Sequence, residues 1–591
     1  MRTVVQALED AALSTDAGYR FIEESGEARF FAYDSVAREA DRFGGVFQEL
    51  GLVPGDRVAL VLTHNRDFVF AFLGALRVGL VPVPIYPPAG LRKLDVYLDN
   101  TLHIVVQSGA KLLLAEARVK RLLGQVRLAA PDLVRIVAVE SVRDSDVPVR
   151  RVRVRPSDTC FLQFTSGSTS RPKGVIVSYE NLAANVHAFM ENGLRVERSD
   201  SGVSWLPLYH DMGLIGFVLG PLYHQRTITY LSPVAFLKRP GRWLQTISAY
   251  GASISFGPNF AYALCVKRLR DADLEGLDLS TWRVAGCGAE PISAGNLAAF
   301  VERFAPVGFD PSSLMPCYGM AEATLAVSFA PLGSGVRTET VDLDRLAREG
   351  RAEPPGAGSA RLTIVNCGST FSGHRVAAFE TDDMTSQRPL PDRRLGELRV
   401  RGPSVTSGYF GAPDLTESAF AGEWLKTGDL GYLVKGDVFV CGRLKELIIV
   451  RGRNYFPQDL ERHAARVEGV RPGNVVAFGT HSIDEGVERV VMALETRLAE
   501  PERRRQLASD VRRTVLEGTG VTLDEILVLD ARVLPKTSSG KLQRAQTREL
   551  FERGVLASRR SVRVTEPLAA ARVLAQSQVA YVRRALFGSR R

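Results

Sequence analysis

The amino-acid sequence predicts an α/β protein with a large N-terminal domain of parallel-type sheets with crossover helices, a small antiparallel barrel-like part and a smaller α/β C-terminal domain. Three observations support this prediction. The chain has 591 residues, too many for a single hydrophobic core. Up to about Cys441, strand-like runs alternate with helix-like runs, which is typical of parallel sheets. From Gly396 the pattern turns to that of antiparallel strands.

The individual elements follow in chain order. Buried strands are expected at residues 58–62 and 81–85, with a helix over 67–76 between them. Two further strands, 160–164 and 175–177, flank a polar turn, and Ser178 is a candidate N-cap for a helix over 182–190. Residues 332–368 interrupt the pattern with charged, Pro- and Gly-rich sequence, which indicates an insertion. Antiparallel strands are then expected at 397–400 and 437–440.

Composition narrows the class of protein. Hydrophobic residues make up 45% of the chain and charged residues 24%, as in ordinary globular proteins. A spanning helix and a signal peptide are not expected, and the six scattered cysteines lack a Cys-x-x-Cys pair, so we predict reduced thiols and a cytoplasmic location. The net charge of +9 comes mostly from the tail after Gly554, with eight arginines against one glutamate. A nearly neutral body argues against a nucleic-acid partner.

The stretch FTSGSTSRPKG, residues 164–174, has the chemistry of an anion-binding loop. Two glycines let the backbone approach a ligand, hydroxyl groups can donate to phosphate oxygens, and Lys173 adds a positive charge. The spacing is not that of a Walker loop, because Pro-Lys-Gly stands where Gly-Lys-Ser/Thr is required. The alternative is a surface Ser/Thr turn.

Further polar turns follow along the chain: GCGAEP (286–291), CYGMAEAT (317–324), KTGDLG (426–431), GRLKELIIVRGRNYFPQDLE (442–461) and LPKTSSGKLQR (534–544). If a helix begins at Tyr318, Tyr318 and Glu322 share one of its faces. Asp429 on a turn can accept from two hydroxyls at once. Taken singly, each of these residues has a structural alternative, such as a core tyrosine or an Asx turn. Together they describe a nucleotide site.

In this order the stretches resemble those of the adenylate-forming superfamily, which includes acyl-CoA synthetases, luciferases and peptide-synthetase adenylation domains. The resemblance covers residues 3–554. Within the superfamily, FGPNFAYALC (256–265), CGAEP, YGMAEATL and RGRNYFPQDLE are most similar to the fatty acyl-AMP ligases, as is the apparent insertion over 336–365. Ala321 stands where a threonine is usual in the superfamily, and matches this subgroup.

The resemblance implies roles for particular residues. The expected phosphate-binding residues are Thr165, Ser166, Gly167, Ser168, Thr169 and Lys173. Adenine and ribose are expected at Gly288, Ala289, Glu290, Pro291, Tyr318, Gly319, Met320, Ala321, Asp429 and Arg443. The expected catalytic residues are Lys541, Glu322 and His210, with Glu322 as the Mg²⁺ ligand, and the acyl pocket is expected at Trp205, Asn259 and Phe260.

It also implies a domain division and a reaction. Residues 1–441 form the large domain, 442–447 a hinge at Lys445, 448–554 a small mobile domain with the catalytic lysine, and 555–591 a basic tail. The implied reaction activates a fatty acid with ATP and Mg²⁺, and then transfers the acyl group to the phosphopantetheine thiol of a separate acyl carrier protein. Two alternatives stay open, a long-chain acyl-CoA synthetase and a catalytically silent nucleotide-binding scaffold. The tail fits an acidic carrier protein, an anionic membrane or simple solubilisation.

Overall fold

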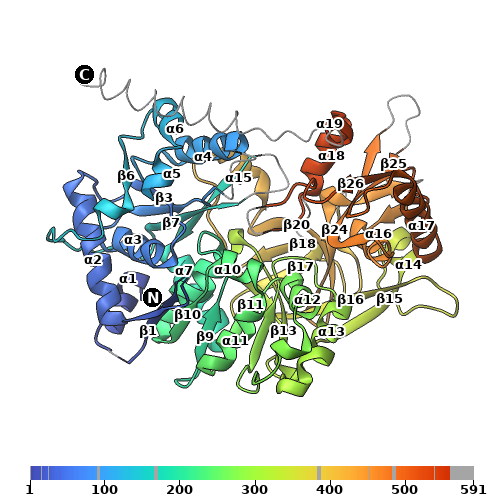
Figure 1. Ribbon diagram of the computed structural model, residues 1–591, viewed down its shortest axis with the longest axis horizontal. Coiled ribbons are helices and arrows are strands. Elements are labelled where there is room, and N and C mark those ends of the chain that lie inside the picture. Colours follow the sequence, from blue (N-terminus) through green and yellow to red (C-terminus); the bar gives the residue numbers. More distant parts are fainter. Residues whose placement is uncertain are drawn as a thin grey trace.

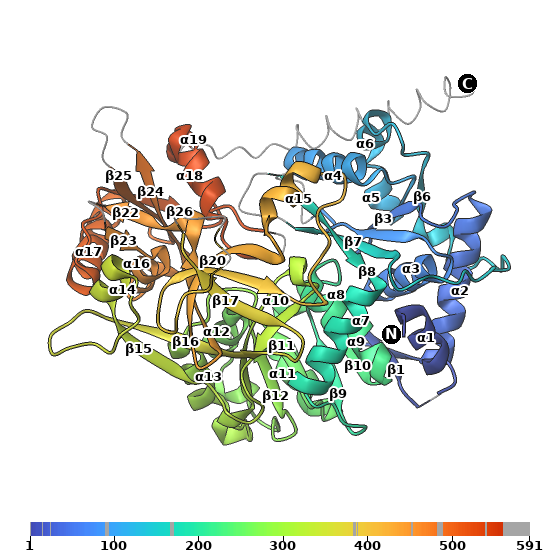
Figure 2. The same cartoon turned by 180° about the vertical axis from the view of Figure 1, so that it is seen from behind.

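The computed structural model describes residues 2–14, 16–23, 25–88, 94–165, 171–381, 386, 388–450, 453–481, 488–537 and 540–558. Two bodies of unequal size lie side by side in it (Figure 1). The larger body runs from the N-terminus to about β21 (Asp437–Arg443), and the smaller body holds the strands and helices that follow. Figure 2 shows the same division from behind.

The N-terminal part of the large body is a parallel sheet covered by helices. Its strand order is β4 (Val81–Pro84), β3 (Arg57–Val61), β5 (Leu112–Ala115), β6 (Arg135–Ala138), and every pairing is parallel. The helices α2 (Tyr33–Glu49), α3 (Asn65–Arg77) and α4 (Leu94–Ser108) alternate with these strands along the chain. Because the strands are buried, their sequences are nearly continuous apolar runs.

The second sheet changes from parallel to antiparallel along its width. Its parallel part is β10 (Thr227–Tyr230), β9 (Ser201–Ser204), β11 (Ile254–Gly257), β12 (Val284–Cys287) and β13 (Leu314–Gly319). Its antiparallel part is β14 (Ala326–Phe329), β16 (Arg361–Thr370), β21, β20 (Trp424–Val434), β18 (Gly396–Arg401) and β17 (Arg375–Phe379). The predicted change from parallel to antiparallel strands is confirmed, but its position is not. The sequence placed the change at Gly396, whereas antiparallel pairing already begins between β13 and β14.

The hairpin of β7 (Thr159–Thr165) and β8 (Lys173–Ser178) carries the predicted anion loop. The two strands pair antiparallel with Thr165 opposite Lys173, so the loop is pinned at both ends. Residues 166–170, which include Ser166, Gly167, Ser168 and Thr169 of the prediction, lie outside the described residues. Ser178 caps α7 (Tyr179–His187) as expected, and its hydroxyl accepts from the backbone N–H of Asn181 in a capping box.

Residues 336–365 fold into a strand, a helix and the first half of another strand. β15 (Thr338–Asp342) pairs with β16, and α14 (Leu343–Glu349) lies between them in the chain. The apolar side chains of this segment share a core with the barrel strands and with residues at the start of the small body: Val341, Leu343, Leu346, Leu362, Ile364, Leu430, Tyr432, Phe439 and Phe456. Figures 1 and 2 both show α14 beside the small body.

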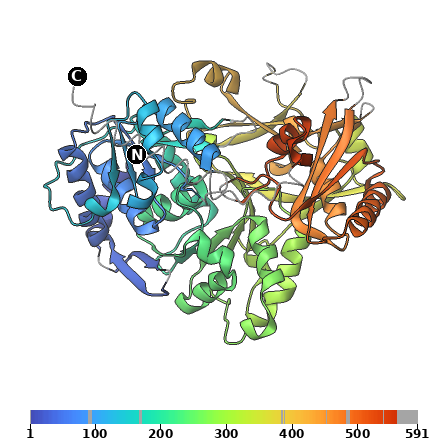
Figure 3. The same ribbon diagram turned by 45° about the horizontal axis from the view of Figure 1, so that its top comes forward.

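The small body begins with the hairpin β22 (Ile448–Val450) and β23 (Arg453–Tyr455). The sheet β24 (Val470–His481), β25 (Glu488–Thr496), β26 (Glu525–Asp530) packs with α16 (Pro457–Ala464), α17 (Pro501–Thr519) and α18 (Arg544–Glu552), as Figure 3 shows from above. A last short helix, α19 (Val555–Ser558), buries Leu556 completely against Val476 and Phe478. Among the described helices, none combines the length and apolarity that a membrane crossing requires.

Candidate active site

Tyr318, Asp429 and Arg443 form the best-defined cluster of predicted residues. The Tyr318 hydroxyl donates to Oδ2 of Asp429 over 2.7 Å, and Nε of Arg443 lies 3.1 Å from Oδ1 of the same carboxylate. Asp429 and Arg443 are cross-strand partners on β20 and β21. Burial raises the pKa of Asp429, and the positive charge of Arg443 opposes that rise. The carboxylate is thus held in place by two donors from different strands.

The local structure around Tyr318 and Asp429 differs from the expectation. Tyr318 lies in the strand β13, and Glu322 lies in a separate 3₁₀ turn at Ala321–Ala323, so the suggested shared helical face is wrong. Asp429 belongs to the strand β20 rather than to a turn, beside a register irregularity at Leu430/Gly431. Sequence alone missed both facts because a Gly-rich polar stretch looks the same in a turn and at a strand irregularity.

Glu322 and Lys173 both contact Tyr409, one at its hydroxyl and the other over its ring. The hydroxyl of Tyr409 donates to Oε1 of Glu322 over 2.9 Å, and Nζ of Lys173 lies 5.1 Å from the centre of the Tyr409 ring. Lys173 opens β8 and Glu322 follows β13, so Tyr409 joins the anion loop to the candidate metal ligand. Sequence analysis did not select Tyr409, because the stretch SGYFG around it carries no charged group and no recognisable spacing.

The loop Gly288–Pro291 is packed closely against β13 and α12 (Asn259–Arg268). A side chain at Gly288 would place its Cβ 2.5 Å from Sγ of Cys317, so only glycine fits there. Ala289 has a left-handed φ of 66°, which is uncommon for a residue with a Cβ. Glu290 accepts from the backbone N–H of Phe260 over 2.6 Å, at the start of α12. This loop is therefore held in one shape before any ligand binds.

The small body contributes Lys541 to the same region. Its backbone N–H donates to Oγ1 of Thr537 over 3.0 Å, which closes a tight turn. Burial lowers the pKa of Lys541, and the carboxylates of Asp211 and Glu290 oppose that change most strongly. Lys541 is therefore buried within electrostatic range of acidic groups of the large body. Asp211 was not selected from the sequence, where it is simply the residue after His210.

His210 and Asp211 begin the short helix α8 (Asp211–Leu214). Burial lowers the pKa of His210 to about 3, and the positive charge of Lys541 contributes to that shift. The imidazole is therefore neutral at physiological pH and acts as a polar neighbour rather than a cation. Burial also raises the pKa of Asp211, while Lys541 and the backbone N–H of Met212 favour its charged form.

The three predicted acyl-pocket residues lie together in an aromatic cluster. The ring of Trp205 stacks on Phe236 with centroids 3.8 Å apart, and its centroid is 6.1 Å from that of Phe260. Oδ1 of Asn259 accepts from the backbone N–H of Ser293 over 3.1 Å. This hydrogen bond connects the aromatic cluster, through the first residue of α12, to the segment that follows the Glu290 loop.

The predicted hinge lies in a 3₁₀ turn, Leu444–Glu446, in which Lys445 is exposed. Its neighbour Glu446 forms an ion pair with Arg544, which also contacts Glu461 over 2.6 Å. Arg544 lies three residues after Lys541 at the start of α18, so the hinge and the Lys541 turn are linked through a single guanidinium group.

Comparison with known proteins gives independent evidence for the family of this chain. The family model described as "AMP-binding enzyme" matches residues 8–410. A Caulobacter vibrioides protein, provisionally named an acyl-CoA synthetase, is 37% identical over 556 residues, which cover 93% of this chain and 96% of that protein. The medium-chain-fatty-acid–[acyl-carrier-protein] ligase TtuA of Teredinibacter turnerae is 32% identical over 547 residues, 83% of this chain and 84% of that protein.

A solved structure from a study of fatty acyl-adenylate ligases of E. coli and L. pneumophila superposes with a TM-score of 0.88. It is 37% identical, and the match covers 94% of this chain and 99% of that one. The same division into a large and a smaller α/β body is therefore found in a relative of known structure. The family model matches most of the chain, and the relatives are similar to it in both sequence and fold. The chain therefore belongs to the family of AMP-binding, adenylate-forming enzymes.

Proposed function

We propose that the protein uses ATP to convert a fatty acid into its acyl-adenylate and then passes the acyl group to the phosphopantetheine thiol of a separate acyl carrier protein. The observation that carries this proposal is the burial of Lys541, a residue of the small body, within electrostatic range of Asp211, Glu290 and Asp429 of the large body. A cation brought by one domain to a carboxylate-lined region of another fits a reaction in which two anions must approach each other.

In the first step a carboxylate oxygen of the fatty acid attacks the α-phosphorus of ATP. The new bond joins that oxygen to phosphorus, and the bond to the bridging oxygen of pyrophosphate breaks. We assign Lys541 to the approaching carboxylate, and Lys173 with residues 165–169 to the departing pyrophosphate. Asp429 accepts from the ribose hydroxyls, Arg443 reaches the ribose, and Tyr318 stacks on the adenine that residues 288–291 and 319–321 border.

Glu322 fits a Mg²⁺ ligand. Its carboxylate accepts a hydrogen bond from Tyr409, which also contacts Lys173 of the phosphate hairpin. The described part of the chain contains no group of three metal-ligating side chains. A lone carboxylate suits Mg²⁺, which commonly keeps water and substrate phosphate oxygens as its other ligands. When bound, the ion would supply charge neutralisation for the phosphates.

In the second step a thiol attacks the acyl carbon, and AMP leaves. The two candidate acceptors are a carrier protein and CoA. The name of the Teredinibacter relative favours a carrier, whereas the name of the Caulobacter relative favours CoA. Residues 341–364 share a hydrophobic core with Phe456, at the start of the small body. We infer that this core restrains the small body and that CoA use requires that body to rotate. The shared core therefore favours a carrier protein as the acceptor.

The test is a direct assay of both steps. The enzyme is incubated with ATP, Mg²⁺ and fatty acids of different lengths, and acyl-adenylate is captured with hydroxylamine. In parallel, the same mixture without hydroxylamine is supplied either with CoA or with a phosphopantetheinylated carrier protein. We expect the hydroxamate and acyl-carrier product. Turnover with CoA alone would select the acyl-CoA synthetase, and absence of hydroxamate with every acid would overturn the proposal.

A further inference from the structure

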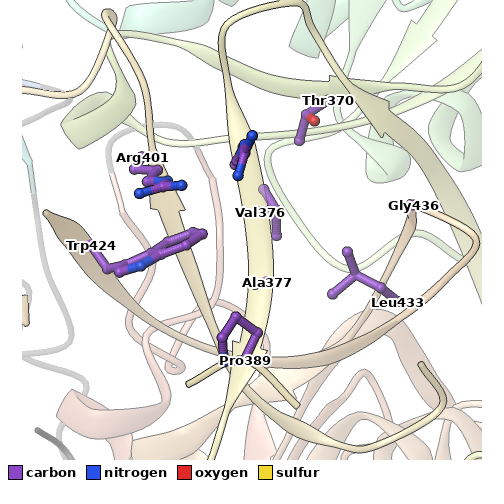
Figure 4. A pocket seen from close by; sticks show the side chains of 9 residues that line it. Thr370, Val376, Ala377, Pro389, Arg401, Trp424, Leu433 and Gly436 are labelled. Atoms are coloured by element: carbon purple, nitrogen blue, oxygen red, sulfur yellow. The ribbon is translucent and has the colours of Figure 1, made fainter. Parts of the chain in front are cut away.

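Two arginines face each other on neighbouring strands of the antiparallel sheet, away from the residues discussed above. Arg375 on β17 and Arg401 on β18 are directly opposite partners in the strand register. Both line a hollow of about 470 Å³ in the surface of the barrel-like part. Its other lining residues are Thr370, Val376, Ala377, Pro389, Trp424, Leu433 and Gly436 (Figure 4).

This pairing is electrostatically unfavourable as it stands. Directly opposite residues of an antiparallel pair have neighbouring side chains, and like charges in that position destabilise the sheet. Arg401 is stacked over Trp424, with its guanidinium carbon 4.7 Å from the ring centre, and it pairs with Glu423 at 3.0 Å. Glu423 is 82% exposed, so water screens most of that attraction.

Arg375 lacks even this compensation. Its side chain is exposed, and among the described residues no carboxylate forms an ion pair with it. Two positive charges therefore line the hollow, and the one described carboxylate that pairs with either of them, Glu423, is screened by solvent and is not a lining residue. An anion placed between the two guanidinium groups would remove the repulsion and gain charge-assisted hydrogen bonds from both.

The walls restrict what kind of anion fits. Trp424 is 7% exposed and Val376 is 8% exposed, and together with Pro389 and Leu433 they form an apolar part of the wall beside the polar part that holds the two arginines. In Figure 4 the Trp424 ring lies directly beneath Arg401, and Leu433 stands across the hollow from it. A volume of about 470 Å³ also exceeds what a single inorganic anion fills, and is within the usual size range of small-molecule sites.

We propose that the hollow of Arg375, Arg401 and Trp424 binds a phosphate group that carries an organic moiety, at a site separate from the adenylate-forming centre. Arginine is suited to this ligand because its planar fork donates two parallel hydrogen bonds to phosphate. The phosphate sits between the two guanidinium groups, and the organic moiety covers the apolar wall. The ligand can come from solution, as a phosphate monoester, or from a lipid headgroup.

The experiment is a binding titration on the full chain. The adenylate-forming centre is first filled with a non-hydrolysable ATP analogue, so that the anion loop is already occupied. sn-Glycerol phosphate is then titrated by calorimetry into the wild type, R375Q, R401Q and the double variant. The control is R268Q, which removes an exposed arginine of α12 that forms no ion pair within the described part of the chain.

We expect each single variant to weaken binding about tenfold, because one charged donor is lost, and the double variant to bind nothing. R268Q should match the wild type. Acyl-adenylate formation serves as the folding check, since neither arginine belongs to the catalytic machinery. Unchanged affinity in the double variant would overturn the proposal.

A second measurement separates the sources of the phosphate. Vesicles of phosphatidylglycerol, with phosphatidylcholine vesicles as the neutral control, are co-sedimented with the wild type and the double variant. Arginine-dependent binding of phosphatidylglycerol vesicles identifies a headgroup site, and arginine-dependent binding of the free ester alone identifies a soluble ligand. If the wild type binds neither probe, the hollow is not a phosphate site and the inference is wrong.

Discussion

The phenol oxygen of Tyr318 lies 2.7 Å from Oδ2 of Asp429, although 111 residues separate the two in the chain. The bond joins the end of β13 to the middle of β20, and Arg443 contacts the other oxygen of the same carboxylate. A ribose that binds to Asp429 must therefore share the carboxylate with two protein donors. This relationship sets the first prediction.

Replacing Asp429 by Ala should raise the KM for ATP more than the KM for the fatty acid, because the change removes acceptors on the ribose side. Tyr318→Phe removes only the hydroxyl and keeps the ring, so it should cost about 1–3 kcal/mol at most and retain more ATP affinity than Asp429→Ala. Calorimetry with ATP and steady-state kinetics test both variants. Unchanged ATP affinity in Asp429→Ala would mean that the nucleotide lies elsewhere.

Lys541→Ala should slow acyl-adenylate formation by about 10²–10³-fold, the usual cost of one preorganised charge in a catalytic site. The fold should survive, because the side chain belongs to a turn closed by backbone and Thr537 contacts. The control is Lys267→Ala, at an exposed position in the last turn of α12. A well-folded Lys541→Ala enzyme with normal rates would remove Lys541 from the mechanism.

The pH profile should report Lys541 and not His210. Burial lowers the pKa of Lys541 below 10.5, so its charge is lost at a lower pH than in a free lysine, and kcat/KM for adenylation should fall on the alkaline side. The unfolded chain binds this proton more tightly, so the contribution of Lys541 to the free energy of unfolding increases as pH rises through that window. In an active Lys541→Arg variant, the fall of kcat/KM on the alkaline side should shift to higher pH.

His210 should give no inflection between pH 5 and 8, because burial lowers its pKa to about 3. Profiles of kcat/KM for the wild type and His210→Asn, measured over pH 5 to 10, check this expectation. An acidic limb near pH 6.5 that disappears in His210→Asn would show that the imidazole is far more solvated than the structure has it.

The contact between residues 341–364 and Phe456 should restrain the small body. Removing residues 336–365 outright would cut β16, which spans 361–370, so a point change is the sharper test. Phe456→Leu should keep adenylation and raise acyl-CoA formation if this packing excludes CoA. The matched control is Phe478→Leu, which perturbs a different core of the same body. An equal rise in both variants, or no rise in a folded Phe456→Leu, would contradict the restraint.

Truncation tests the basic tail, and the structure places the cut. Leu556 is fully buried against Phe478, so the chain must be kept through Ser558, not only through Gly554. Loss of residues 559–591, which lie outside the described residues, should leave adenylation unchanged. If the tail recruits an acidic carrier, transfer should slow most at low salt. If it binds membrane, vesicle co-sedimentation should fall instead, and a solubilising tail predicts neither change.

The sequence by itself determined the features that depend on neighbouring residues. The two strands that flank the polar turn, the Ser178 N-cap and the presence of an antiparallel part all follow from local propensity and periodicity. The strand at which the antiparallel part begins, β14, does not. Resemblance to a family added Lys541, Asp429 and Glu322 as an ordered set. No stretch of sequence, however, shows which carboxylates surround a lysine.

Only the tertiary structure decided the contacts between distant segments. Tyr409 joins Lys173 to Glu322, Asp211 interacts electrostatically with Lys541, and Arg375 stands opposite Arg401. None of these pairings has a local signal in the sequence. The physical reason is that strand pairing and domain packing are set by the burial of whole apolar faces. Polar side chains are then carried to positions that no periodicity of the chain encodes.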